Sequence, residues 1–409
     1  MTVETAASRD GWWQRFSDPQ LNQLIAQSLY NNRDIRIAEA HLREARANRG
    51  VTAARLLPSV TAGADASRGV QGIIGGNKPF SLYEATFDAS WEIDLFGATQ
   101  RRTEAADALA GAGEAALNHV QVSLIAEIVR NYIDMRTAQN QMRITERAIA
   151  AQQETLDLSV ARRNAGLASD LEVSQAEVQK LATESKLPDY RAAYAAAIGR
   201  LNTLAGEMPG TIDALFDEVK PIPALMQEVV LSTPASVIAS RPDIRAAERR
   251  LASATALTAA SVADLFPKFS LSALLGMQNT SVLPSTSVWS AGGNLLTPVF
   301  DFGRLRGRID AADAAQEAAL AEYEQTVMLA LEEVETSLAR YLQSEARLTT
   351  LQLAVESNLN TVQLAGERYR QGITAFSEVL TAERSLYESE SALADAQADN
   401  SRQVAALYK

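Results

Sequence analysis

Apolar residues recur every seven positions over two long stretches of the chain, which is the spacing of coiled-coil helices. No proline lies between Pro79 and Pro188, or after Pro298, so nothing in the sequence interrupts a helix there. The pattern predicts helices over about 99–165 and 305–371, each on the order of 100 Å long at ~1.5 Å per residue. The defining positions are Ile128, Met135, Met142, Ile149 and Leu156, then Val334, Tyr341, Leu348, Val355 and Val362.

Each long helix is predicted to end at a glycine, Gly166 or Gly372, whose left-handed conformation lets the chain turn back. Residues that can cap a returning helix follow each turn, namely Ser169 or Asp170 in the first stretch and Thr374 or Ser377 in the second. The sequence therefore predicts two long helical hairpins with tight tips. An ordinary antiparallel coiled coil would satisfy the same pattern.

A second pattern is the strict alternation of apolar and polar residues over Tyr83–Asp94, which indicates a strand with one apolar and one polar face. Three other stretches suggest strands, although the two faces of the last one are less distinct and Pro298 must lie near its end or a bulge. Their lengths suit tilted membrane strands of ~9–11 residues, and also a half-buried sheet on a soluble core. The predicted strands cover 58–68, 82–95, 267–277 and 288–300.

The same residue types return at an offset of about 206–209 positions, which indicates an internal tandem duplication. Matching pairs are Asp34-Ile35-Arg36 with Asp243-Ile244-Arg245, Leu57-Pro58 with Phe266-Pro267, Phe96-Gly97 with Phe302-Gly303, and Gly166 with Gly372. We predict three segments on this basis. They are a first repeat over 1–206 with its hairpin at 99–187, a linking segment over 207–233, and a second repeat over 234–409 with its hairpin at 304–409.

Four strands cannot close a transmembrane barrel, since the smallest barrels have about eight. If the strands lie in a membrane, several chains must share one barrel, and three chains would supply twelve strands. No run of 18 apolar residues occurs, so the sequence predicts no transmembrane helix. The expected fold is mainly α, with long antiparallel hairpins forming an α-barrel and a β-barrel part in a membrane.

Candidate chemistry is sparse. The only histidines are His41 and His119, there is no cysteine, and no phosphate-binding loop or metal-binding motif is found. We therefore expect no enzyme activity, and no catalytic, cofactor or metal site. The formal net charge of −12 argues against a nucleic-acid partner, which would need a basic surface. Acidic residues on the polar strand faces would line a water-filled lumen that favours cations.

Several short strings together resemble a known family over practically the whole chain. They are GWWQRFSDPQL at 11–21, NRDIR at 32–36, WEIDLFG at 91–97, SRPDI at 240–244 and RYRQG at 368–372. In these residues the chain resembles the outer-membrane factors of Gram-negative tripartite efflux pumps, in the OprM/NodT-like branch of the TolC superfamily. The resemblance implies a homotrimer with a 12-stranded β-barrel, an α-helical barrel, and an equatorial belt built from the N-terminal segment, residues 206–233 and the C-terminal end.

The resemblance also implies a location and partners. It places the protein in the Gram-negative outer membrane, extending into the periplasm, as a passive duct for small-molecule drugs in transit. The implied partners are a periplasmic adaptor (membrane fusion protein), an inner-membrane RND pump and outer-membrane lipid. Members are usually lipoproteins with a signal peptide and an N-terminal cysteine, and we expect both to have been removed from this chain. The alternatives are a TolC-like duct for protein or metal-ion export, and a soluble coiled-coil scaffold.

Site residues are carried over from the family by position. The gate is expected at the hairpin tips, with Arg370 and Arg384 as a latch, and relatives commonly carry aspartate where this chain has Thr381. The expected gate or constriction residues are Tyr369, Arg370, Thr381, Glu383 and Arg384. The expected adaptor-facing tip residues are Ala165, Gly166, Leu167, Gly372, Ile373 and Thr374. The expected lipid-facing residues of the barrel are Tyr83, Phe87 and Trp91.

Overall fold

The computed structural model describes residues 11–70, 79–224, 240–281 and 284–408, which divide into two compact units. Unit 1 is drawn from Met1–Ile37, Asn118–Val237 and Leu329–Lys409, and unit 2 from Ala38–Leu117 and Ile238–Met328. Each unit therefore takes residues from both halves of the sequence.

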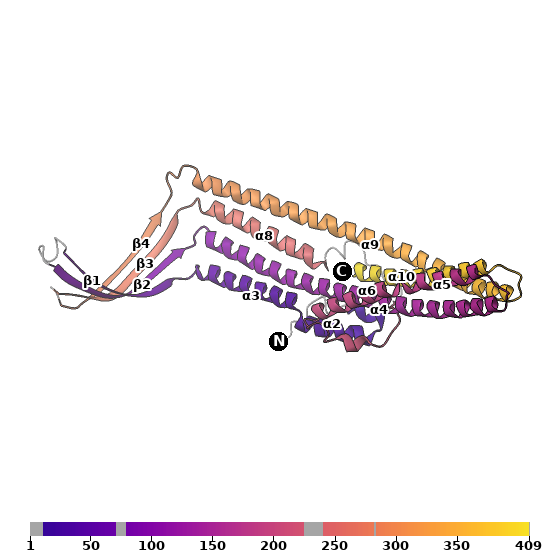
Figure 1. The fold of residues 1–409 in the computed structure, drawn as a ribbon. Coiled ribbons are helices and arrows are strands. Elements are labelled where there is room, and N and C mark those ends of the chain that lie inside the picture. Colours follow the sequence, from indigo (N-terminus) through magenta and orange to yellow (C-terminus); the bar gives the residue numbers. More distant parts are fainter. Residues whose placement is uncertain (1–10, 71–78, 225–239, 282–283, 409) are drawn as a thin grey trace. The chain divides into compact units, whose positions relative to one another are not determined.

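Unit 2 contains one antiparallel sheet of four strands in the order β1-β2-β3-β4 (Figure 1). The two middle strands come from different halves of the sequence, because β2 pairs with β3. The fourth strand ends at Leu296, before the predicted limit of 300, since Pro298 has no backbone N–H to donate to a ladder. The strands are β1 (Ser59–Val70), β2 (Pro79–Ile93), β3 (Lys268–Thr280) and β4 (Thr286–Leu296).

The pairing register separates the two faces of this sheet. Phe87 lies opposite Ala62 on one side and Leu275 on the other, and Leu275 lies opposite Trp289, so these residues form one apolar row. The other face carries a row formed by Asp65, Glu84, Gln278 and Thr286. The register thus assigns a face to each residue of β4, which the sequence pattern alone left indistinct.

The helices of unit 2 pack through small residues and surface ion pairs. Ala105 and Ala112 on α4 and Ala260 on α8 are buried. Arg49 pairs with Asp107 at 2.7 Å, which connects α3 to α4, and Thr258 donates to the carbonyl of Ala312 at 3.0 Å, which connects α8 to α9. These helices are α3 (Arg33–Ala54), the first part of α4 (Ala98–Asn164), α8 (Pro242–Ala263) and the first part of α9 (Arg304–Arg370).

Unit 1 holds the two helical hairpins, and α10 lies beside α5 within it (Figure 1). The returning helix of the first hairpin stops at Glu184, and a separate helix begins at Leu187 with Pro188 in its first turn, where a missing N–H is tolerated. Its elements are η1 (Trp12–Phe16), α2 (Pro19–Asn31), the rest of α4, α5 (Asp170–Glu184), α6 (Leu187–Leu204), η2 (Asp213–Phe216), the rest of α9, and α10 (Phe376–Leu407).

The core of unit 1 surrounds the middle of α4. Its fully buried side chains include Ile128, Val129, Ile133 and Met135 on α4, with Leu21 and Ile25 on α2 and Leu201 on α6. The described ends of the chain meet in this unit, where Trp12 stacks on Tyr408 with ring centroids 5.3 Å apart. Among the helices that the structure describes, none is sufficiently long and apolar to cross a membrane.

Candidate functional site

The two hairpin tips of unit 1 have the same backbone geometry. Gly166 and Gly372 adopt left-handed φ values of +77° and +73°, which L-residues with a side chain rarely adopt. In each tip the glycine N–H and the next N–H bond back to the end of the long helix, a Schellman arrangement. These bonds run from Gly166 and Leu167 to the carbonyls of Arg163 and Arg162, and from Gly372 and Ile373 to those of Tyr369 and Arg368.

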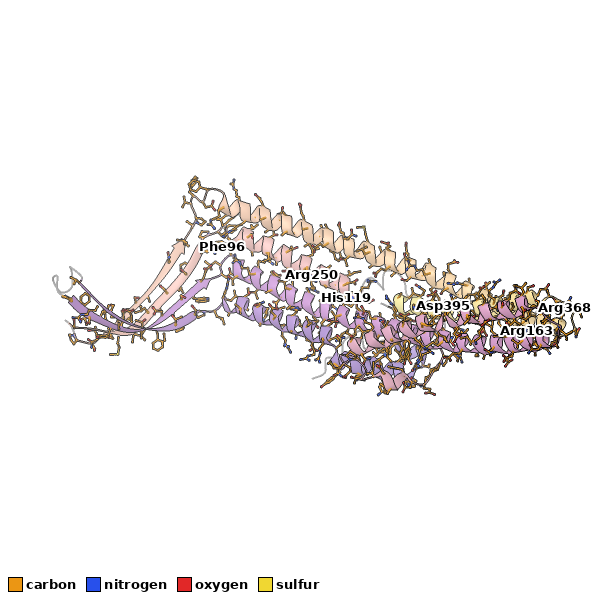
Figure 2. The ribbon with its side chains drawn as sticks, in the orientation of Figure 1. Phe96, His119, Arg163, Arg250, Arg368 and Asp395 are labelled. Carbon is orange, nitrogen blue, oxygen red and sulfur yellow. The ribbon has the colours of Figure 1, made fainter. Side chains whose placement is uncertain are left out.

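The exposed surface of the tips includes backbone, two apolar side chains and arginines. Leu167 and Ile373 occupy the same position after the glycine, and both are mostly exposed. A Cβ atom added at either glycine would meet no atom within 4 Å, so another chain can approach the backbone there. Arg163 and Arg368 lie beside the turns at this end of unit 1 (Figure 2).

The helices after the tips are capped differently. Ser169 caps α5, accepting from the backbone N–H of Glu172 at 3.4 Å, as predicted. The prediction of Thr374 or Ser377 as the cap of α10 was wrong, because Ala375 holds that position without a side-chain bond. The Thr374 hydroxyl instead donates to the Glu378 carboxylate at 2.6 Å, so it is satisfied one turn into the helix.

Tyr369 lies in a small hydrophobic core beneath the tips, together with Ala176, Phe376, Val379 and Leu380. Its ring is 5.2 Å from that of Phe376, and the Arg162 guanidinium lies 4.6 Å from its centroid. The Tyr369 hydroxyl donates to Glu172 at 2.9 Å, and burial followed by this bond raises the pKa of the phenol. Residues from α4, α5, α9 and α10 meet here, so the two hairpins are joined at their tips.

The remaining predicted gate residues lie on α9 and α10 with different exposure. Arg370, Thr381 and Arg384 are exposed, and the nearest carboxylate oxygen to Arg384 belongs to Glu388, at 4.0 Å. Glu383 faces α4, where one carboxylate oxygen accepts from the Thr155 hydroxyl at 2.5 Å. Its other oxygen is buried and has no hydrogen-bond partner among the described residues. Burial raises the pKa of Glu383.

A groove of about 670 Å³ runs between α5 and α10 in unit 1. Thr381 and Arg384 line it, so two of the predicted gate residues face the same groove as α5, the returning helix of the first hairpin. Its apolar lining comes from Leu171, Val178 and Leu380, and its charged lining from Lys186, Arg384 and Glu388.

In unit 2 the apolar sheet face is exposed to solvent. Phe87 is 61% exposed, and Tyr83 is exposed to a similar degree. Trp91 is only half-buried, and its indole N–H donates to the carbonyl of Leu56 at 2.9 Å, which fixes the ring at the end of the sheet. The three predicted lipid-facing residues therefore share one face, since their positions differ by even numbers along β2.

A buried arginine network in unit 1 was not predicted. Arg136 on α4 is 0% exposed, and its guanidinium donates to the carbonyl of Glu218 and to the side chains of Gln139, Gln20 and Tyr132 at 2.6–3.2 Å. The Tyr132 hydroxyl donates to Asp18 at 2.6 Å, and burial and this bond raise the pKa of Tyr132. The network ties α2 and the segment after η2 to α4. The available sequence signal was an arginine directly after Met135, one of the apolar heptad positions.

Among the described residues, no group of histidine, aspartate or glutamate side chains could hold a metal ion. The features that stand out are instead surfaces, namely the tips, the groove and the apolar sheet face.

Comparison with known proteins gives consistent matches. A model of the family described as outer membrane efflux protein matches residues 24–207 and 233–409. The chain is 31% identical to the toluene efflux pump outer membrane protein TtgC of Pseudomonas putida, covering 96% of this chain and 82% of TtgC. It is 28% identical to nodulation protein T of Rhizobium leguminosarum bv. trifolii, covering 94% and 84%. The solved structure of the outer-membrane channel OprN is 39% identical, with a TM-score of 0.91 over 97% of this chain and 91% of that one.

Proposed function

This chain belongs to the outer membrane efflux protein family, and we propose that it is the exit duct of a tripartite RND-type drug efflux pump, working as a homotrimer. Membership of this family means that the protein is an outer-membrane efflux channel and not an enzyme, so the alternative of a soluble scaffold is set aside. The trimer, the pump partners and the gate are the proposed parts.

One observation carries the proposal of a shared barrel. The four-stranded sheet exposes an apolar face, and within the described residues neither β1 nor β4 has a partner strand on its outer edge. Unpaired strand edges and a large exposed apolar surface are unfavourable in a protein that stays alone in water. Three copies joined edge to edge would give a closed barrel of 12 strands, with lipid covering the apolar face.

The polar face would then line the lumen. Glu84 lies directly opposite Asp65, and Asp88 and Glu92 follow on the same face of β2. Like charges on opposed positions repel unless water or cations surround them. Such a lumen suits passive transit of small molecules and has no tight binding pocket, so we assign the choice of drug to the inner-membrane partner. The relative TtgC is named as the outer membrane protein of a toluene efflux pump.

The gate is proposed at the tips, where Arg370 and Arg384 would latch neighbouring helices or protomers. Arg370 has no ion-pair partner among the described residues. Arg384 comes no closer than 4.0 Å to the carboxylate of Glu388, and both of those side chains are exposed. Both guanidinium groups therefore remain available to another chain. Tyr369 would act differently, by holding the end of α9 in the tip core. The exposed backbone around Gly166 and Gly372, with Ala165, Leu167, Ile373 and Thr374, is proposed to receive the periplasmic adaptor.

Conductance in planar bilayers tests the duct and its latch together. The wild-type protein is expected to give small conductance steps, and the double substitution of Arg370→Ala and Arg384→Ala should enlarge them. Arg200→Ala is the control, because Arg200 forms an exposed ion pair with Glu127 on α4 and lies outside the tips. Enlarged steps in the control as well would deny the latch, and an absence of any conductance would contradict the duct.

A further inference from the structure

A cavity of about 430 Å³ lies in unit 2 where the sheet meets the helices. Its walls come from the first turns of α4 and α9, the C-terminal end of α8, the start of β3 and the end of β4. Among the described residues that line it, four side chains are cationic and one is a carboxylate, namely Arg102, Lys268, Arg304 and Arg308 against Asp264. We call this cavity the basic pocket.

Ion pairs inside the chain balance only part of this charge. The Asp264 carboxylate pairs with Arg102 through one oxygen and lies 3.2 Å from the Lys268 amine through the other. The same amine lies 3.6 Å from a carboxylate oxygen of Glu92. Arg304 and Arg308 are exposed, and neither has an ion-pair partner among the described residues. Two guanidinium groups without a counter-charge therefore line one cavity.

The internal repeat shows that the fold does not require cations at these positions. Arg304 begins α9, and its equivalent, Ala98, begins α4. Lys268 begins β3, and its equivalent, Ser59, begins β1. The same elements thus begin with small, uncharged residues in the first repeat, so the charge in the second repeat needs another explanation.

The start of α9 is also a poor place for positive charge. The N-terminal end of a helix carries a partial positive charge, which opposes cations in the first turn. Asp301 already satisfies backbone groups there, because its carboxylate accepts from the N–H groups of Gly303 and Leu305 at 3.1 and 2.9 Å. Arg304 is therefore neither a cap nor a favourable partner of the helix dipole, and a bound anion would relieve the repulsion.

The basic pocket adjoins the polar face of the sheet. Phe269 belongs to the apolar face, so its neighbour Lys268 belongs to the other one, in agreement with its ion pair to Glu92. Further along β2 that face carries Asp88 and Glu84. If the polar face lines the lumen, as proposed above, a solute in transit meets a positive site at one end of an acidic stretch.

We propose that the basic pocket binds the phosphate or carboxylate group of small anionic solutes on their way through the duct, with Arg304 and Arg308 as the principal ligands. This inference rests on the proposed function and adds a class of substrate to it. A guanidinium group matches an oxyanion because two of its N–H donors can bond two oxygens at once. The acidic residues next to the pocket keep the binding weak, which conduction requires.

Calorimetric titration of the detergent-solubilised protein with inorganic phosphate, at low ionic strength, tests the site. Arg308→Gln should weaken phosphate binding at least about tenfold, because a charge-assisted hydrogen bond is lost. Arg308→Lys, which keeps the charge, should weaken it less. Arg306→Gln is the matched control, since Arg306 is exposed on the same turn of α9 but does not line the pocket. Equal weakening by Arg308→Gln and Arg306→Gln, or by neither, would overturn the site.

A lipid headgroup also carries a phosphate, so a second titration distinguishes the two sources. The detergent micelles are first supplied with phosphatidylglycerol, and inorganic phosphate is then titrated as before. A free solute should bind with unchanged affinity, because the pocket adjoins the polar face and not the apolar one. Loss of phosphate binding in the presence of phosphatidylglycerol, with lipid retention that depends on Arg308 in native mass spectrometry, would overturn the assignment to a solute.

Ion selectivity in planar bilayers separates failure of the site from failure of the duct. Positive charge beside the passage favours anions, so Arg304→Gln with Arg308→Gln should shift the reversal potential in a salt gradient toward cation selectivity. Added phosphate should shift the wild-type protein in the same direction and leave the double variant unchanged. A channel that conducts but shows neither shift overturns the site and leaves the proposed function intact. A protein that binds phosphate and never conducts overturns the proposed function and, with it, the role in transit.

Discussion

The middle of α4 and the equivalent stretch of α9 come from two copies of one repeat, yet their surroundings differ. Ile128 and Met135 on α4 are fully buried, whereas Val334 and Tyr341, at the equivalent positions of α9, are only half-buried. Arg136 is completely buried, and the equivalent residue, Leu342, is 53% exposed. The polar residue is inside and the apolar residue is outside, which reverses the usual preference.

The difference arises from what covers each helix. The N-terminal helix α2 and the segment around η2 wrap the first copy, and their backbone and side chains satisfy the Arg136 guanidinium. The described residues place no equivalent cover over Leu342. Among the described residues, the first copy is thus covered by its own chain, whereas Leu342 and the apolar face of the sheet are exposed.

Replacing Arg136 should have the largest effect, because it removes the hydrogen bonds that tie α2 and the segment after η2 to α4. Arg136→Met leaves the buried carbonyl of Glu218 and the side chains of Gln20 and Gln139 without their donor. We expect a loss of thermal stability equivalent to about 3–5 kcal/mol, measured by scanning fluorimetry in detergent. Arg200→Ala, which removes an exposed ion pair, should cost less than ~1 kcal/mol. Equal losses in the two variants would mean that the network does not hold the first copy together.

Lysine substitutions on the two faces of the sheet in unit 2 compare the apolar face with the polar face. Leu274 and Leu275 are neighbours on β3, where Leu274 lies opposite Asp88 and Leu275 lies opposite Phe87 on the apolar face. Leu275→Lys should cost about 2–4 kcal/mol if that face meets lipid, and should reduce insertion into liposomes. Leu274→Lys should insert normally, because its amine would lie opposite the Asp88 carboxylate on the polar face. Equal insertion of the two variants would contradict the assignment of the faces.

Substitution at Leu342 tests whether the bare surface of the second copy is covered in the assembly. Leu342→Gln should weaken the trimer by about 1–2 kcal/mol per protomer if another copy buries this side chain, since apolar area is worth ~25 cal/mol per Å². Trimer dissociation, followed by native mass spectrometry at rising temperature, measures the effect. Leu331→Gln, at another exposed position of α9, tells whether the covered surface is local or general. An unaffected trimer would show that solvent covers Leu342.

A smaller effect is expected at the tips, where Gly166 and Gly372 are equivalent in the two copies and have nearly the same backbone conformation. Gly372→Val should lower the free energy of unfolding by about 1–2 kcal/mol, because φ is +73° there. A Cβ atom at this position meets no neighbour, so the whole cost comes from the backbone conformation. Gly372→Asn should cost less, because asparagine tolerates this conformation. A Val variant that is as stable as the Asn variant but fails to restore drug efflux would assign the glycine to adaptor docking. Loss of stability alone would assign it to the turn.

The smallest expected effect is the pH dependence contributed by Glu383. Its pKa is raised in the folded protein, so its contribution to stability is full below the ordinary glutamate pKa and is lost as pH rises through the raised value. Glu383→Gln should therefore flatten the fall in melting temperature over that window. Glu388→Gln, an exposed substitution on the same helix, should retain the wild-type profile. A flat profile in the wild-type protein would mean that Glu383 is well solvated and contributes no such dependence.

Periodicity predicted the elements well where all the side chains on one face of an element are of one kind, apolar or polar. The alternation over Tyr83–Asp94 gave the correct faces of β2, because side chains point to opposite sides along a strand. The faces of β4 could not be assigned from its glycines and serines and required pairing with β3. The buried state of Arg136 depends on residues far away in the sequence, such as Gln20 and Glu218, and no local pattern encodes that contact. The gate residues remain a prediction.

The mass of the particle with and without detergent tests most directly whether the exposed surfaces are completed by other molecules. Sedimentation in detergent should give three chains of 44.1 kDa with a bound detergent belt, and removal of detergent should cause aggregation. A single chain that binds no detergent and stays dispersed in plain buffer would contradict the account, since the apolar sheet face would then need neither lipid nor a second copy.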